Sequence, residues 1–171
     1  WLRVQGGLFH LQKGLLPFVE ARLRRRNGAS WRDAIQRAAG APANAAPDAY
    51  SLLKTLIYWW ADTFRDAFEG ADRHKARSLV TLALDARNAA AHAAGGMEDA
   101  EALRALDAIH ELLRLTDAPA AEIAAVKVLY DAQRHAGPAE RAVVKPAASG
   151  AAVAPRSGSN ADRILAHIRA H

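Results

Sequence analysis

The stretch DAYSLLKTLIYWWADTFRDAF, residues 48–68, indicates the fold class, because its large apolar side chains recur at helical spacing. These side chains form one broad stripe: Leu52, Leu53, Leu56, Trp59, Trp60, Phe64 and Phe68. A helix with so wide an apolar stripe has to bury it against neighbouring elements. We therefore predict that residues 48–68 form a core helix.

The sequence on either side of this helix is also helical in pattern, and no strand alternation stands out. The spacing predicts helices over about residues 8–26, 73–94, 98–115 and 118–136, with a short helix after Ser30. Leu82 belongs to the predicted apolar face of the second of these ranges, and Val128 to that of the fourth. Short connections favour antiparallel neighbours, so we predict an all-α, antiparallel helical bundle over residues 1–136.

The C-terminal sequence differs in composition from the bundle. Residues 137–158 are rich in proline, alanine and glycine without periodicity, which is typical of a linker. The pattern of residues 159–171 predicts a short helix whose sequence resembles the first helix of a winged-helix domain. Because the chain begins at Trp1 and has no methionine there, we expect it to be fused to, or to work with, further domains.

Composition excludes several kinds of site. The chain has no cysteine, which removes disulfides and thiolate chemistry and fits a reducing compartment. Its longest apolar runs are far shorter than the ~20 residues that span a bilayer. We therefore expect a cytoplasmic protein without membrane contact, and no glycine-rich phosphate loop or other cofactor motif is present.

Positive charge gathers at the chain ends, and the segment ARLRRRNG is its densest run. Arg22, Arg24, Arg25 and Arg26 come at the end of a predicted helix, where cations favour the negative end of the helix dipole. The same four side chains can form a patch that attracts phosphates. The sequence leaves both interpretations open, and the four arginines are our candidate nucleic-acid-binding residues.

A second candidate site lies in DARNAAAHAAGG, residues 85–96, at the end of a predicted helix. His92 is five positions after Arg87, so the two lie ~140° apart around a straight helix, whereas Asn88 and His92 lie ~40° apart. Two other arginine–histidine pairs, Arg3 with His10 and Arg104 with His110, have comparable spacing and no supporting context. We attribute those two pairs to chance.

The segment LVTLALDARNAAAHAAGGMEDAEALRALDAIHELLRLTDAPAAEIAAVKVLY resembles the HEPN superfamily of helical bundles, known for an arginine–polar–x–x–x–histidine motif. The earlier pieces GLLPFVEARLRR, SWRDAIQ and LLKTLIYWWADTF are similar to one branch of it. That branch is named after a eukaryotic endoribonuclease of transcript quality control, and bacterial members stand at the front of large ATPases and defence proteins. The resemblance runs from about Leu8 to Tyr130.

This resemblance implies metal-independent RNA cleavage in active members, with motifs from two subunits meeting at a dimer interface. Arg87, Asn88 and His92 match the motif positions and are our candidate catalytic residues. Relatives tend to carry a tryptophan inside the motif where this chain has only alanine. We therefore predict an RNA-related or phage-defence module that dimerises and recognises RNA or positions a larger enzyme, with a metal-independent endoribonuclease as the alternative.

Two weaker candidates complete the set. His167 and His171 lie one helical turn apart, but the glutamate that follows the first histidine of zinc peptidases is Ile168 here, so we predict no metal site. Tyr58, together with the two tryptophans that follow it, can stack nucleobases. Their place in the apolar stripe favours a core position for all three.

Overall fold

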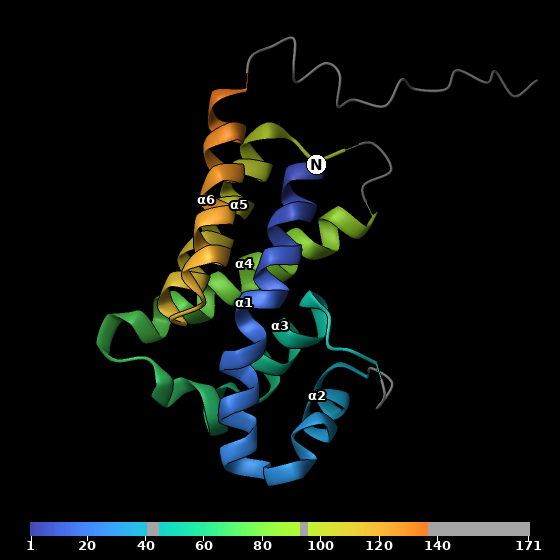
Figure 1. The fold of residues 1–171 in the computed structure, drawn as a ribbon, viewed down its shortest axis with the longest axis vertical. Coiled ribbons are helices and arrows are strands. Elements are labelled where there is room, and N and C mark those ends of the chain that lie inside the picture. The colour runs from blue at the N-terminus through green and yellow to red at the C-terminus, as the bar shows by residue number, and fades with distance from the viewer. Residues whose placement is uncertain (41–44, 93–95, 137–171) are drawn as a thin grey trace, which may run out of the picture.

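The computed structural model describes residues 1–40, 45–92 and 96–136, and within them the chain is all-α, as predicted (Figure 1). The described residues form six α-helices: α1 (Leu2–Asn27), α2 (Trp31–Ala39), α3 (Ala49–Tyr58), α4 (Gly70–His92), α5 (Asp99–Leu115) and α6 (Ala120–His135). A 3₁₀ turn, Gly28–Ser30, joins α1 to α2. The linker and terminal helix predicted for residues 137–171 lie outside the described residues.

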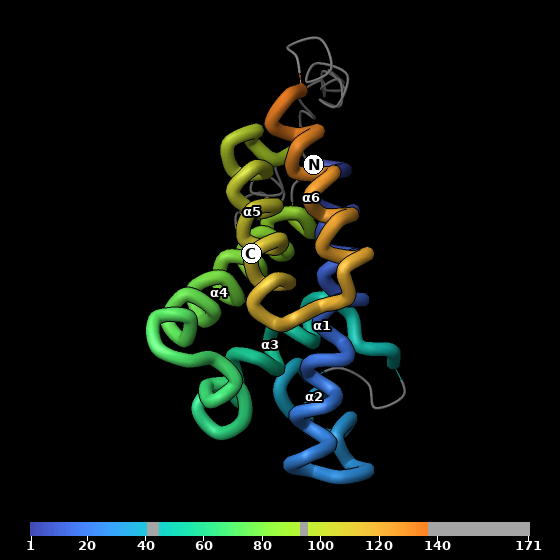
Figure 2. Tube along the Cα trace, turned by 60° about the vertical axis from the view of Figure 1, so that its left-hand side comes forward, coloured from blue at the N-terminus to red at the C-terminus, as the bar shows by residue number. Residues whose placement is uncertain are grey.

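Helix α1 is the centre of the bundle and contacts each of the other five helices. Its buried stripe follows the helical period and consists of Val4, Leu8, Leu11, Leu15, Val19 and Leu23. Figures 1 and 2 show α5 and α6 beside the N-terminal part of α1, and α2 and α3 beside its C-terminal part. The bundle therefore has two ends, joined by one long helix.

Glycines in α1 set how closely α5 and the turn after it approach α1. A Cβ atom built on Gly14 would lie 2.5 Å from Leu113 Cδ2 and 3.2 Å from Ala118 Cβ, and one on Gly7 would lie 2.8 Å from Leu106 Cδ2. Cβ contacts under 3.0 Å essentially do not occur, and Leu106 and Leu113 are fully buried with little room to move. The helices pack at this distance because the glycines have no Cβ.

Gly14→Ala should therefore destabilise the bundle, because the added methyl group overpacks the α1–α5 contact, at a cost of about 1–3 kcal/mol. Gly6→Ala is the matched control: its Cβ would meet only the flexible end of Leu129, at 3.1 Å, while gaining the same helix propensity. Urea unfolding of both variants checks this. Equal stabilities for the two variants would contradict the packing argument.

The core helix predicted over residues 48–68 is not continuous: α3 ends at Tyr58, and a π turn (Trp60–Phe64) and a 3₁₀ turn (Arg65–Ala67) follow. The predicted core residues of this stretch are nevertheless buried, with Trp59 partly so. Changing the helical pitch lets Trp60 stack on Phe68, with ring centroids 5.6 Å apart, while Phe64 stacks on Phe18 of α1 at 6.0 Å. The segment thus gives up regular α-helical hydrogen bonding after Tyr58 and gains these aromatic contacts.

Three apolar residues predicted to face the core are exposed. Tyr58 is 61% exposed, Leu82 52% and Val128 67%. Val128 lies two residues, or ~200°, from the buried Val126, and Leu82 lies beside the α4 stripe rather than in it. Tyr58 is the last residue of α3, where the pitch changes.

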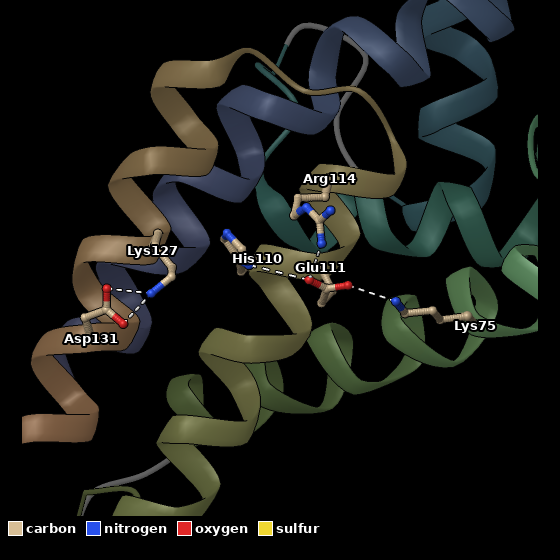
Figure 3. Close-up of polar contacts among 6 residues, drawn as sticks. All are labelled: Lys75, His110, Glu111, Arg114, Lys127 and Asp131. Carbon is tan, nitrogen blue, oxygen red and sulfur yellow. Dashed lines mark hydrogen bonds and ion pairs between the residues drawn. The ribbon is translucent and has the colours of Figure 1, made fainter.

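Polar contacts fasten α4 to α5 at the helix surfaces (Figure 3). Glu111 Oε2 accepts a hydrogen bond from Lys75 Nζ at 2.8 Å, and Glu111 Oε1 accepts one from Arg114 Nη1 at 3.0 Å. The hydrogen bond from Lys75 is the main cause of a lowered pKa at Glu111. Lys127 and Asp131 form a separate pair within α6.

Because the folded-state pKa of Glu111 is lowered, its contribution to stability is present above the ordinary glutamate pKa and is lost as the pH falls through the lowered value. We expect Glu111→Gln to cost less than about 1 kcal/mol at pH 7, since Lys75 is half-exposed. The gap between wild type and variant should close in acid. Urea unfolding at neutral pH and near pH 3 measures it, and a gap independent of pH would refute the assignment.

Candidate functional site

Arg87 lies on α4 where this helix faces the start of α3. Its guanidinium carbon lies over the Tyr50 ring, 4.5 Å from the centroid, and Arg87 Nη2 lies 4.0 Å from Asp48 Oδ2. Asp48 is the N-cap of α3, where its Oδ1 accepts a hydrogen bond from the Ser51 backbone N–H at 2.8 Å. The cation is thus held by an aromatic face and, more loosely, by a capping carboxylate.

The other two motif residues follow along the same helix. Arg87 Nη1 donates a long hydrogen bond, 3.4 Å, to Asn88 Oδ1. His92 is exposed in the last turn of α4 and makes no hydrogen bond or ion pair with the part of the chain that the structure describes. Arg87 is directed toward α3, and no contact joins it to His92. Arg87 and Asn88 are therefore brought together, whereas the His92 imidazole has no partner among the described residues.

The alanines inside the motif do not form one smooth outer surface. Ala90 is buried in the core, Ala89 is partly buried, and Ala91 is exposed. Trp1 Nε1 donates a hydrogen bond to the Ala90 carbonyl at 3.4 Å, so the start of α1 lies beside the end of α4. On α4, Ala91 is therefore exposed directly before His92, and the partly buried Asn88 lies about one turn before it.

Sequence reasoning missed Asp48 and Tyr50 as the residues that hold Arg87. Both are 37 or more positions away in the chain, and their contact with Arg87 depends on how α3 and α4 pack. A local signal did exist for Asp48: an aspartate directly after a proline and three residues before a serine amide is a common N-cap arrangement. No comparable signal marks Tyr50.

The four candidate arginines of α1 divide into two groups. Arg22, Arg25 and Arg26 line an open depression together with Asp62 and Thr63. Within it, Arg26 Nη1 donates to the Asp62 carbonyl at 2.8 Å and to Thr63 Oγ1 at 3.1 Å. Arg24 lies elsewhere: it pairs with Glu20 at 2.6 Å and lies over the Trp31 ring at 5.3 Å.

The electrostatics of this depression favour an anion. Arg22 and Arg25 form no ion pair with the described residues, while Arg26 is 3.6 Å from the Asp62 carboxylate. Burial, followed by the nearby charge of Arg25, lowers the pKa of Arg22 below that of a free arginine. Unpaired neighbouring cations repel one another, and a bound phosphate relieves that repulsion.

In both arginine–histidine pairs attributed to chance, the histidine lies against a glutamate. His10 Nδ1 contacts Glu122 Oε2 at 2.6 Å and ties α1 to α6, and His110 lies beside Glu111.

Among the described residues, no group of three or more candidate ligands lies close enough to hold a metal ion. His167 and His171 lie outside those residues. No helix in the described ranges is long and apolar enough to cross a membrane.

Comparison with known proteins agrees with this architecture. A family model described as Swt1-like HEPN matches residues 7–117, which is more than half of the chain and runs from the second turn of α1 to just past α5, the motif on α4 included. No match was found among curated proteins or among solved structures. On this match and the all-α bundle, the chain belongs to the Swt1-like HEPN family.

Proposed function

We propose that this chain is an RNA-binding HEPN module that dimerises through the C-terminal end of α4. The observation that carries this proposal is the separation of Arg87 from His92 within one chain. Arg87 is held against α3, whereas His92 is exposed and unpartnered among the described residues. A second copy, related by a two-fold axis beside His92, would bring two imidazoles and two Arg87–Asn88 pairs to one surface.

RNA suits that surface chemically. A guanidinium is a bidentate ligand for phosphate oxygens, and Arg87 is already oriented by the Tyr50 ring, so little side-chain entropy is lost on binding. The depression of Arg22, Arg25 and Arg26 at the other end of α1 supplies a second cationic contact. In this proposal the module recognises RNA or positions a larger RNA-acting or phage-defence enzyme.

The exposure of His92 favours a second candidate function, metal-independent RNA cleavage. His92 of one subunit would accept the proton of the ribose 2′-hydroxyl, whose oxygen attacks the phosphorus, and the partner's His92, protonated, would give a proton to the leaving 5′-oxygen. Arg87 would stabilise the charge that develops on the phosphoryl oxygens. The products are a 2′,3′-cyclic phosphate and a free 5′-hydroxyl.

Dimerisation is tested with Ala91→Glu, which places a carboxylate beside His92 on the proposed contact. We expect a wild-type dimer in light scattering at micromolar concentration and a monomer for the variant, because two symmetry-related charges would be desolvated together. Ala132→Glu, at an exposed position on α6, is the matched control and should stay dimeric. A monomeric wild type would overturn the composite site.

Cleavage is tested with His92→Ala and Arg87→Ala. If the wild type cleaves RNA, each variant should lose ~10²-fold or more in rate, the usual scale for a positioned acid, base or charge-stabilising group. Activity should survive EDTA and leave a 2′,3′-cyclic phosphate detectable by mass spectrometry. Cleavage that needs a metal, or that persists without His92, would contradict this mechanism. A dimer that binds RNA without cleaving it would support the recognition role and exclude cleavage by this chain alone.

A further inference from the structure

Tyr58 is an exposed aromatic residue that the proposed site does not use. Its side chain is 61% exposed at the end of α3, next to the half-buried Trp59, and the two ring centroids are 5.0 Å apart at an interplanar angle of 69°. No described residue hydrogen-bonds or ion-pairs with Tyr58. An exposed phenol ring with a fixed indole at its edge offers a flat, supported surface.

Two arginines from different helices meet at that indole. Arg26 of α1 lies 5.0 Å from the Trp59 ring centroid, and Arg37 of α2 lies 5.5 Å from it. Trp59 itself is fixed, because its Nε1 donates to the Ala34 carbonyl at 3.1 Å. Arg37 is exposed and has no ion pair with the described residues. Trp59, whose ring contacts Tyr58, therefore holds both guanidiniums. Arg37 keeps its charge unpaired among the described residues, while Arg26 is 3.6 Å from the Asp62 carboxylate.

We propose that Tyr58, Arg26 and Arg37 form a subsite for one nucleotide of a single-stranded RNA, with the base stacked on Tyr58 and its phosphate bound by the arginines. Stacking platforms flanked by cations are how proteins hold single strands without reading their sequence. The depression of Arg22 and Arg25 adjoins the same Arg26 and extends the phosphate-binding surface. That the ligand is RNA rests on the proposed function; the base-stacking role rests on Tyr58 and its neighbours.

Helix α3 links this subsite to the motif on α4. Tyr50, which holds Arg87, and Tyr58 belong to the same helix and are eight residues apart, so about 12 Å of helix axis separates them. A strand of a few nucleotides can reach from one to the other. The subsite would thus anchor one part of an RNA while the α4 motif contacts another part.

The experiment compares two probes by fluorescence anisotropy: a 2′-O-methyl uridine oligonucleotide, which cannot be cleaved, and an abasic strand with the same backbone. Wild type should bind the oligonucleotide more tightly than the abasic strand. Tyr58→Ala should weaken oligonucleotide binding about tenfold and leave abasic binding unchanged, whereas Tyr58→Phe should bind as wild type. Val128→Ala, which removes exposed apolar surface on α6, is the control and should change nothing.

Arg37→Gln tests the phosphate half of the subsite. It should weaken both probes and lower the salt dependence of binding by about one counterion, since one phosphate contact is lost. Circular dichroism checks that each exposed-site variant is folded. Tyr58→Ala binding as tightly as wild type would overturn the proposal, as would equal wild-type affinity for the two probes. If polyglutamate displaces the oligonucleotide and the wild type binds the two probes equally, this surface binds an acidic protein instead.

Failure of this subsite and failure of the proposed function give different results. If Tyr58→Ala loses binding while the wild type forms no dimer and does not cleave RNA, the subsite stands and the composite site fails. If the wild type dimerises and cleaves RNA but Tyr58→Ala binds normally, the composite site stands and the subsite is refuted.

Discussion

The close approach of α1 to α5 is the constraint on which the rest of the structure depends. Gly7 and Gly14 allow it, because a side chain at either position would overlap Leu106 or Leu113. With these helices in contact, one long helix can serve as the axis of the whole bundle. Trp1, at the start of this helix, donates a hydrogen bond to the Ala90 carbonyl near the α4 motif, and the last turn of the helix carries Arg26 next to Trp59.

Arginines held by aromatic rings recur at both ends of this axis. Arg22 lies over Phe18 and Arg37 over Trp59, and neither has an ion pair with the described residues. Arg87 lies over Tyr50 and is 4.0 Å from the Asp48 carboxylate. A ring supports the flat guanidinium by its electron-rich face while leaving the charge available, whereas a carboxylate partner would cancel it. This type of contact suits a protein whose cations have to be positioned before a phosphate arrives.

Much of the fold follows from sequence periodicity, because a bundle needs little more than apolar stripes and breaks between them. The end of α3 at Tyr58 could not be predicted in this way, because residues 48–68 keep a helical pattern throughout. The pitch changes there because Phe64 packs against Phe18 of α1 and Trp60 packs against Phe68. The exposure of Tyr58 was missed for the same reason.

The candidate sites were foreseen to different degrees. Arg87, Asn88 and His92 could be named from their spacing and the family resemblance, but the ring that holds Arg87 comes from a distant segment. The division of the α1 arginines could have been foreseen: Arg22, Arg25 and Arg26 are three and four residues apart and share a face, whereas Arg24 lies ~200° from Arg22.

The π turn at Trp60–Phe64 has a consequence for how this family can vary. Such a turn holds one more residue than the α-helical turn it replaces, so it behaves like a single-residue insertion accommodated inside a helix. Loss of one residue there would restore regular pitch and rotate everything beyond it by ~100° relative to α3. Chain length in this segment, more than its composition, then decides which aromatic residue is left at the surface.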